Sequence, residues 1–261
     1  MNLSLAGQVL VVTGSTQGVG RSVALEAAAN GVEALLITGR DPARGAAVVA
    51  EAEALGAKAH FAAVDLADAG AADMIADAAI RRFGRIDALV NAAGLTDRGS
   101  MVSADPALWD KLFVVNAKTP FFLMQRAIND MRARKKPGAI VNILSINVHG
   151  GATDLTVYSA SKAALALVTR NAAQAHRFDR IRINGINMGW ADTPAERVMH
   201  AETLGKGPDW LAEQAAVQPF GRLLAPEDVA RLTHFLLSPA SEPMTGSVID
   251  QEQSAIGPRD A

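Results

Sequence analysis

The sequence predicts an α/β protein in which a doubly wound, seven-stranded parallel sheet is flanked by helices on both faces. Three observations predict this fold. Segments of strand and helix character alternate along most of the chain. The expected strands are continuous apolar runs, which is typical of parallel strands covered on both faces. A glycine-rich stretch directly follows the first strand, where folds of this class turn from strand to helix.

The first part of the chain predicts four strands and the three helices between them. Val9–Thr13 is a short apolar run, and a helical pattern follows from about Val19 to Asn30, where Gly31 suits a helix C-terminus. The later elements repeat this order, with strands at Leu35–Thr38, Ala59–Val64 and Ala88–Asn91 and helices at Pro42–Leu55 and Ala71–Phe83.

The second part continues the alternation and completes the sheet. Helices are expected at about Asn116–Arg134, Tyr158–Arg177 and Pro226–Leu237, and strands at Ala139–Ile143, Ile181–Ile186 and Ser247–Asp250. Parallel strands joined by helices require right-handed crossovers, so these elements predict one doubly wound sheet.

Residues 1–261 are expected to form a single domain, because no low-complexity linker or internal repeat divides them. The least regular part is residues 189–219, which carry several Pro and Gly residues between a strand and a helix. A connection of this length is seldom inert, so we expect a mobile flap over a site. An ordinary surface insertion is the alternative.

Composition excludes several classes of function. The formal net charge of −2 argues against nucleic acid or an anionic membrane as the main partner. The chain has no cysteine and its five histidines show no metal-ligand spacing, so we expect no metal site. It has neither a signal-peptide pattern nor an apolar run of about 20 residues, and we therefore expect a soluble cytoplasmic protein.

The stretch Thr13–Gly20 predicts a phosphate-binding turn. Gly14 permits a tight turn, Gly18 lets the backbone approach a pyrophosphate, and Gly20 lets the helix pack closely on the strand. Backbone N–H groups at a helix N-terminus attract an anion. A purely structural turn would also use glycine, but the strand before it and the helix after it favour nucleotide binding.

These residues, with others that follow in order, resemble the short-chain dehydrogenase/reductase family. After Thr-Gly-x-x-x-Gly-x-Gly come Asp65-Leu66, Asn91-Ala92-Ala93-Gly94, Asn116, Ser145 and Tyr158-Ser159-Ala160-Ser161-Lys162. The resemblance covers almost the whole chain and implies a single NAD(P)-binding Rossmann domain that forms a homotetramer or homodimer. The cofactor contacts that it implies are Gly14, Thr16, Gln17, Gly18, Val19, Arg40, Asp65, Leu66, Asn91, Ala92, Gly94, Tyr158, Lys162, Gly189, Ala191 and Thr193.

The same resemblance implies a catalytic set of Asn116, Ser145, Tyr158 and Lys162. Hydride transfer to a carbonyl leaves an alkoxide that must be protonated, and a phenol can supply that proton although its ordinary pKa is about 10. Tyr158 and Lys162 lie four residues apart, so they share one helix face, and a nearby ammonium is expected to lower the tyrosine pKa. In the family the serine polarises the substrate oxygen and the asparagine supports a proton relay.

The end of the second strand bears on the choice between the two nicotinamide cofactors. Gly39 stands where NAD-preferring relatives usually carry an acidic residue, and Arg40 could pair with the 2′-phosphate of NADP. Asp41 weakens this argument, unless it caps the following helix, and Gln17 is neutral where many NADP-preferring relatives are basic. NADP is therefore favoured slightly over NAD.

The substrate end departs from the family pattern at two places. Met188 replaces the usual proline before Gly189, and Gln251-Glu252 replaces the usual pair of glycines. Candidate substrate-binding residues are Ser145, Asn147, His149, Tyr158 and Trp190, with Trp210 as a further pocket candidate. Amide, imidazole and indole groups suit a sugar, sugar acid or polyol, although these residues could instead pack the flap.

A 3-oxoacyl-type ketone reductase of the same family and a non-catalytic nucleotide-binding sensor remain alternatives. An enoyl reductase is disfavoured, since such relatives space the tyrosine and lysine more widely. A serine hydrolase is disfavoured because no Gly-x-Ser-x-Gly elbow surrounds Ser145.

Overall fold

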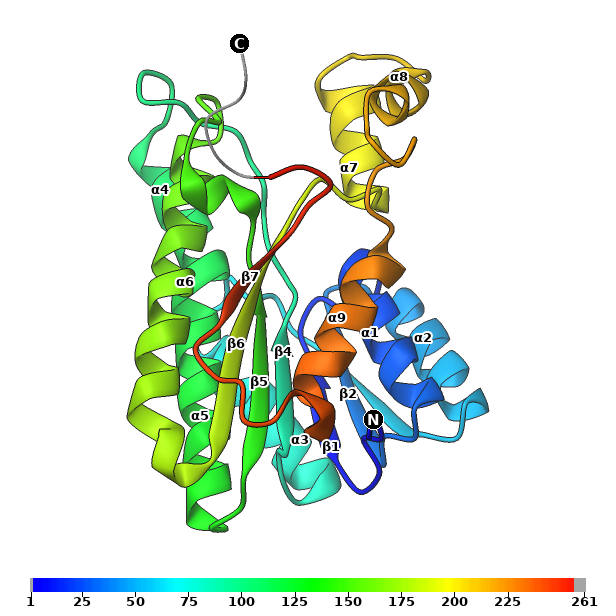
Figure 1. Ribbon diagram of the computed structural model, residues 1–261, viewed down its shortest axis with the longest axis vertical. Helices are drawn as coiled ribbons and strands as arrows, with labels where there is room; N and C mark the ends of the chain where they lie inside the picture. The colour runs from blue at the N-terminus through cyan, green and yellow to red at the C-terminus, as the bar shows by residue number, and fades with distance from the viewer. Residues whose placement is uncertain (1, 256–261) are drawn as a thin grey trace.

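The sheet of the computed structural model, which describes residues 2–255, contains seven parallel strands in the order β3-β2-β1-β4-β5-β6-β7 (Figure 1). The order reverses direction between β1 and β4. Ligands of doubly wound sheets bind beyond the carboxyl ends of the strands at such a reversal. The strands are β1 (Val9–Val12), β2 (Ala34–Gly39), β3 (Lys58–Ala63), β4 (Ala88–Asn91), β5 (Gly138–Ile143), β6 (Ile181–Met188) and β7 (Val248–Gln251).

Helices cover both faces of the sheet (Figure 1). One layer consists of α1 (Gly18–Ala29), α2 (Pro42–Ala54) and α9 (Pro226–Leu237), and the other of α3 (Ala71–Phe83), α5 (Thr119–Ala133) and α6 (Thr156–His176). The helix α4 (Pro106–Phe113) continues into α5 through a single π-helical turn, Val114–Lys118. The sequence pattern had placed this helical stretch from about residue 116, whereas it begins at Pro106 with α4.

Two apolar layers form the core, one on each face of the sheet. Within β1, Leu10 and Val12 belong to one layer and Val11 to the other, because successive strand residues point to opposite faces. This explains why the central strands are continuous apolar runs, as predicted. The edge strands differ: β3 alternates between exposed and buried residues, and β7 is only half buried.

Residues 189–219 are more regular than the sequence predicted. They contain α7 (Pro194–Val198), a π-helical turn (Met199–Thr203) and α8 (Trp210–Ala216), and they rise above the carboxyl edge of the sheet (Figure 1). Proline at the first position of α7 and a side-chain cap from Thr193 start this helical stretch. Among residues 2–255, no helix has the length and apolar character needed to span a bilayer.

Candidate active site

A cleft of about 1170 Å³ lies along the carboxyl edge of the sheet, at the reversal of strand order. It extends from the glycine-rich turn to the segment that begins α7. Nearly all residues predicted for the cofactor and the substrate line it: Gly14, Thr16, Gln17, Gly18, Val19, Arg40, Asp65, Leu66, Ala92, Gly94, Ser145, Asn147, His149, Tyr158, Lys162, Gly189, Trp190, Ala191 and Thr193.

The glycine-rich turn forms a cradle without side chains. Gly14 and Gly18 adopt left-handed backbone conformations, with φ of +63° and +53°. A Cβ at Gly20 would lie 2.4 Å from the carbonyl oxygen of Gly14, so the start of α1 packs directly on the turn. The exposed N–H groups at the N-terminus of α1 can therefore approach a pyrophosphate, and the turn fits a dinucleotide.

From the glycine-rich turn, the cleft extends to the carboxyl end of β2. Arg40 reaches the edge of the cleft, and its guanidinium is 3.7 Å from the carboxylate of Asp65. Asp41 caps α2 by accepting hydrogen bonds from the backbone N–H groups of Ala43 and Arg44, at 2.9 and 3.1 Å. The Asp41 carboxylate, which weakened the argument for NADP, is thus used to cap α2.

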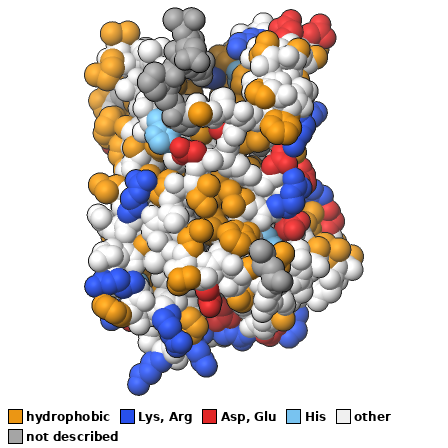
Figure 2. All heavy atoms as spheres, viewed as in Figure 1, with side chains coloured by type: hydrophobic (Ala, Val, Ile, Leu, Met, Phe, Trp, Pro, Cys, Tyr) orange, Lys and Arg blue, Asp and Glu red, His pale blue; other side chains and the backbone are white. Residues whose placement is uncertain are grey.

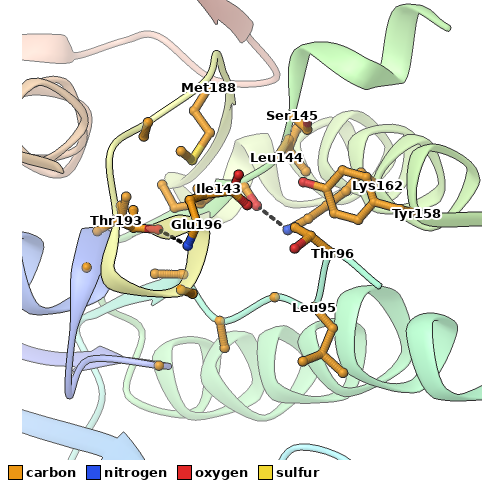
Figure 3. Close-up of a pocket in the computed structure, with 18 of the residues that line it drawn as sticks. Leu95, Thr96, Ile143, Leu144, Ser145, Tyr158, Lys162, Met188, Thr193 and Glu196 are labelled. Carbon is orange, nitrogen blue, oxygen red and sulfur yellow. Dashed lines mark hydrogen bonds between the residues drawn. The ribbon is translucent and has the colours of Figure 1, made fainter. Parts of the chain in front are cut away.

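The predicted catalytic side chains come from two elements that meet at the centre of the cleft. Ser145 follows β5, and Tyr158 and Lys162 extend from one face of α6 (Figure 3). Lys162 is fully enclosed, and its Nζ donates a hydrogen bond to the carbonyl oxygen of Ile143 at 2.8 Å. Figure 3 shows these three side chains on one side of the cavity and Thr193 and Glu196 on the other.

The pKa of Tyr158 departs from the expectation. Burial raises it to about 12, and a hydrogen bond from Ser145 only partly opposes this, while the Glu196 carboxylate raises it further. Burial also lowers the pKa of Lys162 to about 8. The expected lowering of the tyrosine pKa by the lysine is not what this structure shows, because burial of Tyr158 raises its pKa by more than the hydrogen bond from Ser145 lowers it. Tyr158 therefore holds its proton at neutral pH.

Two residues predicted for catalysis or cofactor binding do not line the cleft. Asn116 lies fully buried in the π-helical turn, where its amide donates to the carbonyl of Leu95 and to the hydroxyl of Ser161, each at 3.0 Å, and accepts from the N–H of Leu95 at 2.9 Å. Asn91 donates to Asn142 at 2.8 Å inside the sheet. Both side chains hold the loops and helices around the cleft in place.

The predicted substrate residue His149 is already held by a neighbour. Its Nε2 lies 2.9 Å from the carboxylate of Asp250, which also accepts a hydrogen bond from Asn187 at 2.7 Å. The Ser145 hydroxyl accepts from the backbone N–H of Asn147 at 3.2 Å. The start of the loop after β5 and the end of β7 are therefore joined at the rim of the cleft.

Comparisons with known proteins agree with this geometry. The family model described as Enoyl-(Acyl carrier protein) reductase matches residues 14–252. A cis-4-hydroxycyclohexanecarboxylate dehydrogenase from Sinomonas cyclohexanicum is 34% identical over 95% of this chain and 96% of its own. The chain belongs to the short-chain dehydrogenase/reductase family.

Further members of the short-chain dehydrogenase/reductase family extend the comparison. A galactitol 2-dehydrogenase from Agrobacterium fabrum is 32% identical over 92% of this chain and 94% of its own. The crystal structure of L-sorbose reductase from Gluconobacter frateurii, complexed with NADPH and L-sorbose, is 28% identical, with a TM-score of 0.92 over 99% of this chain and 100% of that one. The chain is accordingly an alcohol/carbonyl oxidoreductase of this family.

Sequence reasoning missed Glu196 and His200 of this short-chain dehydrogenase/reductase cleft, and it noted Glu252 only as a departure from the family pattern. Glu196 stands three residues after Thr193, the spacing of a helix N-terminal cap, which could have placed it at the start of a helix. Glu252 lies against Gly189, where a Cβ would be 2.1 Å from its carboxylate oxygen. The position of His200 had no sequence signal. The pocket candidate Trp210 is buried beneath the cleft instead of lining it.

Proposed function

We propose that this chain is an NADP-dependent oxidoreductase that interconverts a secondary alcohol and a carbonyl group, with Tyr158 as its acid/base. One observation carries the proposal: Ser145, Tyr158 and Lys162 meet in a cleft that begins at a glycine cradle. The four-residue step from Tyr158 to Lys162 supports carbonyl chemistry over reduction of a carbon–carbon double bond.

The nicotinamide cofactor, when bound, supplies or accepts the hydride. In the reducing direction Tyr158 donates its proton to the oxygen of the former carbonyl, which completes the alcohol. Ser145 hydrogen-bonds to the same oxygen and favours the charge that develops there. Lys162 holds the far side of the tyrosine pocket through its bond to Ile143, and Asn116 positions the helix on which that pocket is built. In the oxidising direction Tyr158 must first lose its proton to solvent, and the phenolate then accepts the proton of the substrate hydroxyl.

The choice of NADP is supported by the end of β2. Asp41 is engaged as a helix cap, and a side chain at position 39 would meet the methyl group of Thr16 at 2.7 Å. No acidic side chain can therefore replace Gly39 without displacing its neighbour. Arg40 remains at the cleft edge as a partner for a 2′-phosphate, and Arg44 donates to Gln17 beside it.

A polyhydroxylated substrate, a sugar or polyol, is supported by the polar lining at the substrate end. Asn147, His149 and Glu196 offer donors and acceptors there, and Trp190 offers an indole. The relatives include enzymes named for galactitol and L-sorbose. A 3-oxoacyl-type ketone would instead need room for a long apolar chain, so it is the second candidate.

We also propose that copies of the chain associate as a homodimer or homotetramer. Trp109, Phe121 and Phe122 on α4 and α5 are between 42% and 47% exposed, which is more than a solvated helix face requires. Figure 2 shows hydrophobic side chains gathered over the edge strand β7 and the adjacent α9. The flap role of residues 189–219 and a cytoplasmic location stay predictions.

The experiment compares wild type with Tyr158→Phe, using NADPH or NADH and a panel of ketoses, polyols and acyl ketones in both directions. Loss of general acid/base catalysis should lower kcat about 100- to 10,000-fold. Ser159→Ala is the matched control, since its hydroxyl has no partner among the described residues and lies next to the tyrosine. Tyrosine-independent turnover would contradict the proposal, and binding of NADPH without any turnover would favour the non-catalytic sensor.

A further inference from the structure

Glu196 is the one carboxylate of α7, and it faces Tyr158 across the cleft (Figure 3). Its Oε2 accepts a hydrogen bond from the indole Nε1 of Trp190 at 3.0 Å and lies 3.3 Å from Nε2 of His200. The side chain keeps 21% of its surface exposed, and it lines the cleft. This carboxylate is thus fixed in position and still open to the cavity.

An aromatic stack holds the two donors in place. The ring of His200 packs against two indoles that also contact each other: its centroid is 4.6 Å from that of Trp210 and 4.9 Å from that of Trp190, and the two indole centroids are 5.8 Å apart. Its side chain is only 5% exposed, and burial lowers its pKa although the Glu196 carboxylate opposes this, so the neutral ring with a single N–H is favoured. That N–H has Glu196 as its partner, because Nδ1 has no hydrogen-bond partner among the described residues.

The second carboxylate oxygen of Glu196 has no partner within residues 2–255. An anionic oxygen with spare acceptor capacity attracts hydroxyl hydrogens and repels other anions, most strongly in a partly dehydrated cleft. Arg98, which lines the cleft, is paired with Asp154 and is not an ion-pair partner of Glu196. Lys206 lies near His200, and it too forms no ion pair with Glu196 among the described residues. Glu252 adds a second negative charge beside Gly189.

We propose that Glu196 sets substrate specificity: it accepts a hydrogen bond from a second hydroxyl of a neutral polyol or sugar and excludes the corresponding sugar acid. This inference rests on the proposed alcohol/carbonyl activity and narrows its substrate class. The reacting carbon lies at Ser145 and Tyr158, and the hydroxyl recognised by Glu196 is a different one. Trp190 and His200 are positioning residues that act through Glu196.

The test uses pairs of compounds that differ only at C1, a hexitol and the aldonate with a carboxylate in place of its terminal CH2OH. The hexitol that wild type oxidises fastest with NADP is chosen, and kcat/KM is measured for both members. Glu196→Gln removes the charge and keeps an amide oxygen. Glu196→Asp keeps the charge and withdraws it by one methylene. Glu202→Gln makes the same change at an exposed position of the same segment and is the control.

We expect wild type to prefer the hexitol, and this preference to fall about 10- to 100-fold in Glu196→Gln, as befits the loss of one interaction with a charged group. Glu196→Asp should lose activity on the hexitol while it still rejects the aldonate. Tryptophan fluorescence checks that the stack is intact in each variant, because Trp190 and Trp210 are two of the three tryptophans.

Three results would overturn the inference, and they are distinguishable. If wild type oxidises the hexitol and Glu196→Gln leaves the preference unchanged with an intact stack, Glu196 is not the determinant and the proposed activity stands. If wild type acts only on other alcohols or ketones in a Tyr158-dependent way, the polyol class fails, and the role of Glu196 fails with it. Absence of any Tyr158-dependent turnover would remove the proposed function itself.

Discussion

Replacing Lys162 by methionine should change how the free energy of unfolding depends on pH. Burial lowers the lysine pKa from its ordinary 10.5 to about 8 in the folded protein. Between these two values the unfolded chain binds a proton that the folded chain has lost. Stability therefore rises with pH in this window, and the contribution of Lys162 is lost as the pH falls through about 8.

The magnitude follows from the two pKa values. From pH 7 to about pH 10, linkage at this one group amounts to roughly 2–3 kcal/mol of added stability in wild type. The variant lacks this group, so its stability curve should be flatter by the same amount. The window stops near pH 10 because Tyr158, with a pKa raised to about 12, would begin to lower stability above that point.

The assay is urea unfolding of wild type and Lys162→Met at several pH values and one protein concentration, with the difference between the two curves as the readout. Subtraction cancels the groups that both proteins share. Lys118→Met, which removes an exposed lysine, checks that the loss of a charge alone does not produce the effect. If the difference in unfolding free energy stays constant within about 0.5 kcal/mol across the window, the lowered pKa of Lys162 is refuted.

Three further changes probe other parts of the structure. Arg40→Asp should lower the ratio of kcat/KM for NADPH over NADH at least about tenfold, since it removes the cation at the end of β2; an unchanged ratio would point to another phosphate partner. Gly20→Ala should weaken NADPH binding about a hundredfold in a fluorescence titration, because its Cβ would lie 2.4 Å from a backbone oxygen. Asn142→Ala should cost about 2–4 kcal/mol in urea unfolding, as it leaves the buried amide group of Asn91 without its acceptor and removes a donor from the hydroxyl of Thr169; a smaller cost would mean that Asn91 gains another hydrogen-bond partner.

Much of the fold could be predicted because its signals are local. The central strands are apolar on both faces, and the turn after β1 needs glycine for steric reasons that hold within eight residues. The edge strand β3 was predicted from the same kind of signal, although its pattern is alternating, because half of it faces solvent. The start of α4 was not placed by the sequence pattern, since only the capping Asp105 and the proline that follows it mark this position.

In the candidate site, too, residues with local sequence signals could be predicted, and properties that depend on distant contacts could not. Residues that the motifs predicted stand at strand ends or on one face of α6, where backbone geometry decides their direction. The pKa of Tyr158 could not be predicted from the spacing to Lys162, because it depends on how deeply both groups are buried. The environment of Glu196 could not be predicted either, because Trp190 and His200 contact its carboxylate only in the folded segment.

The half of the cleft proposed to bind the cofactor and the half proposed to bind the substrate should respond differently to mutation. The cofactor half is built from backbone groups and the ends of buried strands, so a change there disturbs the cradle directly and affects every substrate alike. The substrate half is built from one short helix and a stack of three rings that contacts the rest of the cleft through side chains. Substitutions in that stack can change which alcohol is accepted while the hydride-transfer geometry near Tyr158 is kept, which is how one fold can serve many substrates.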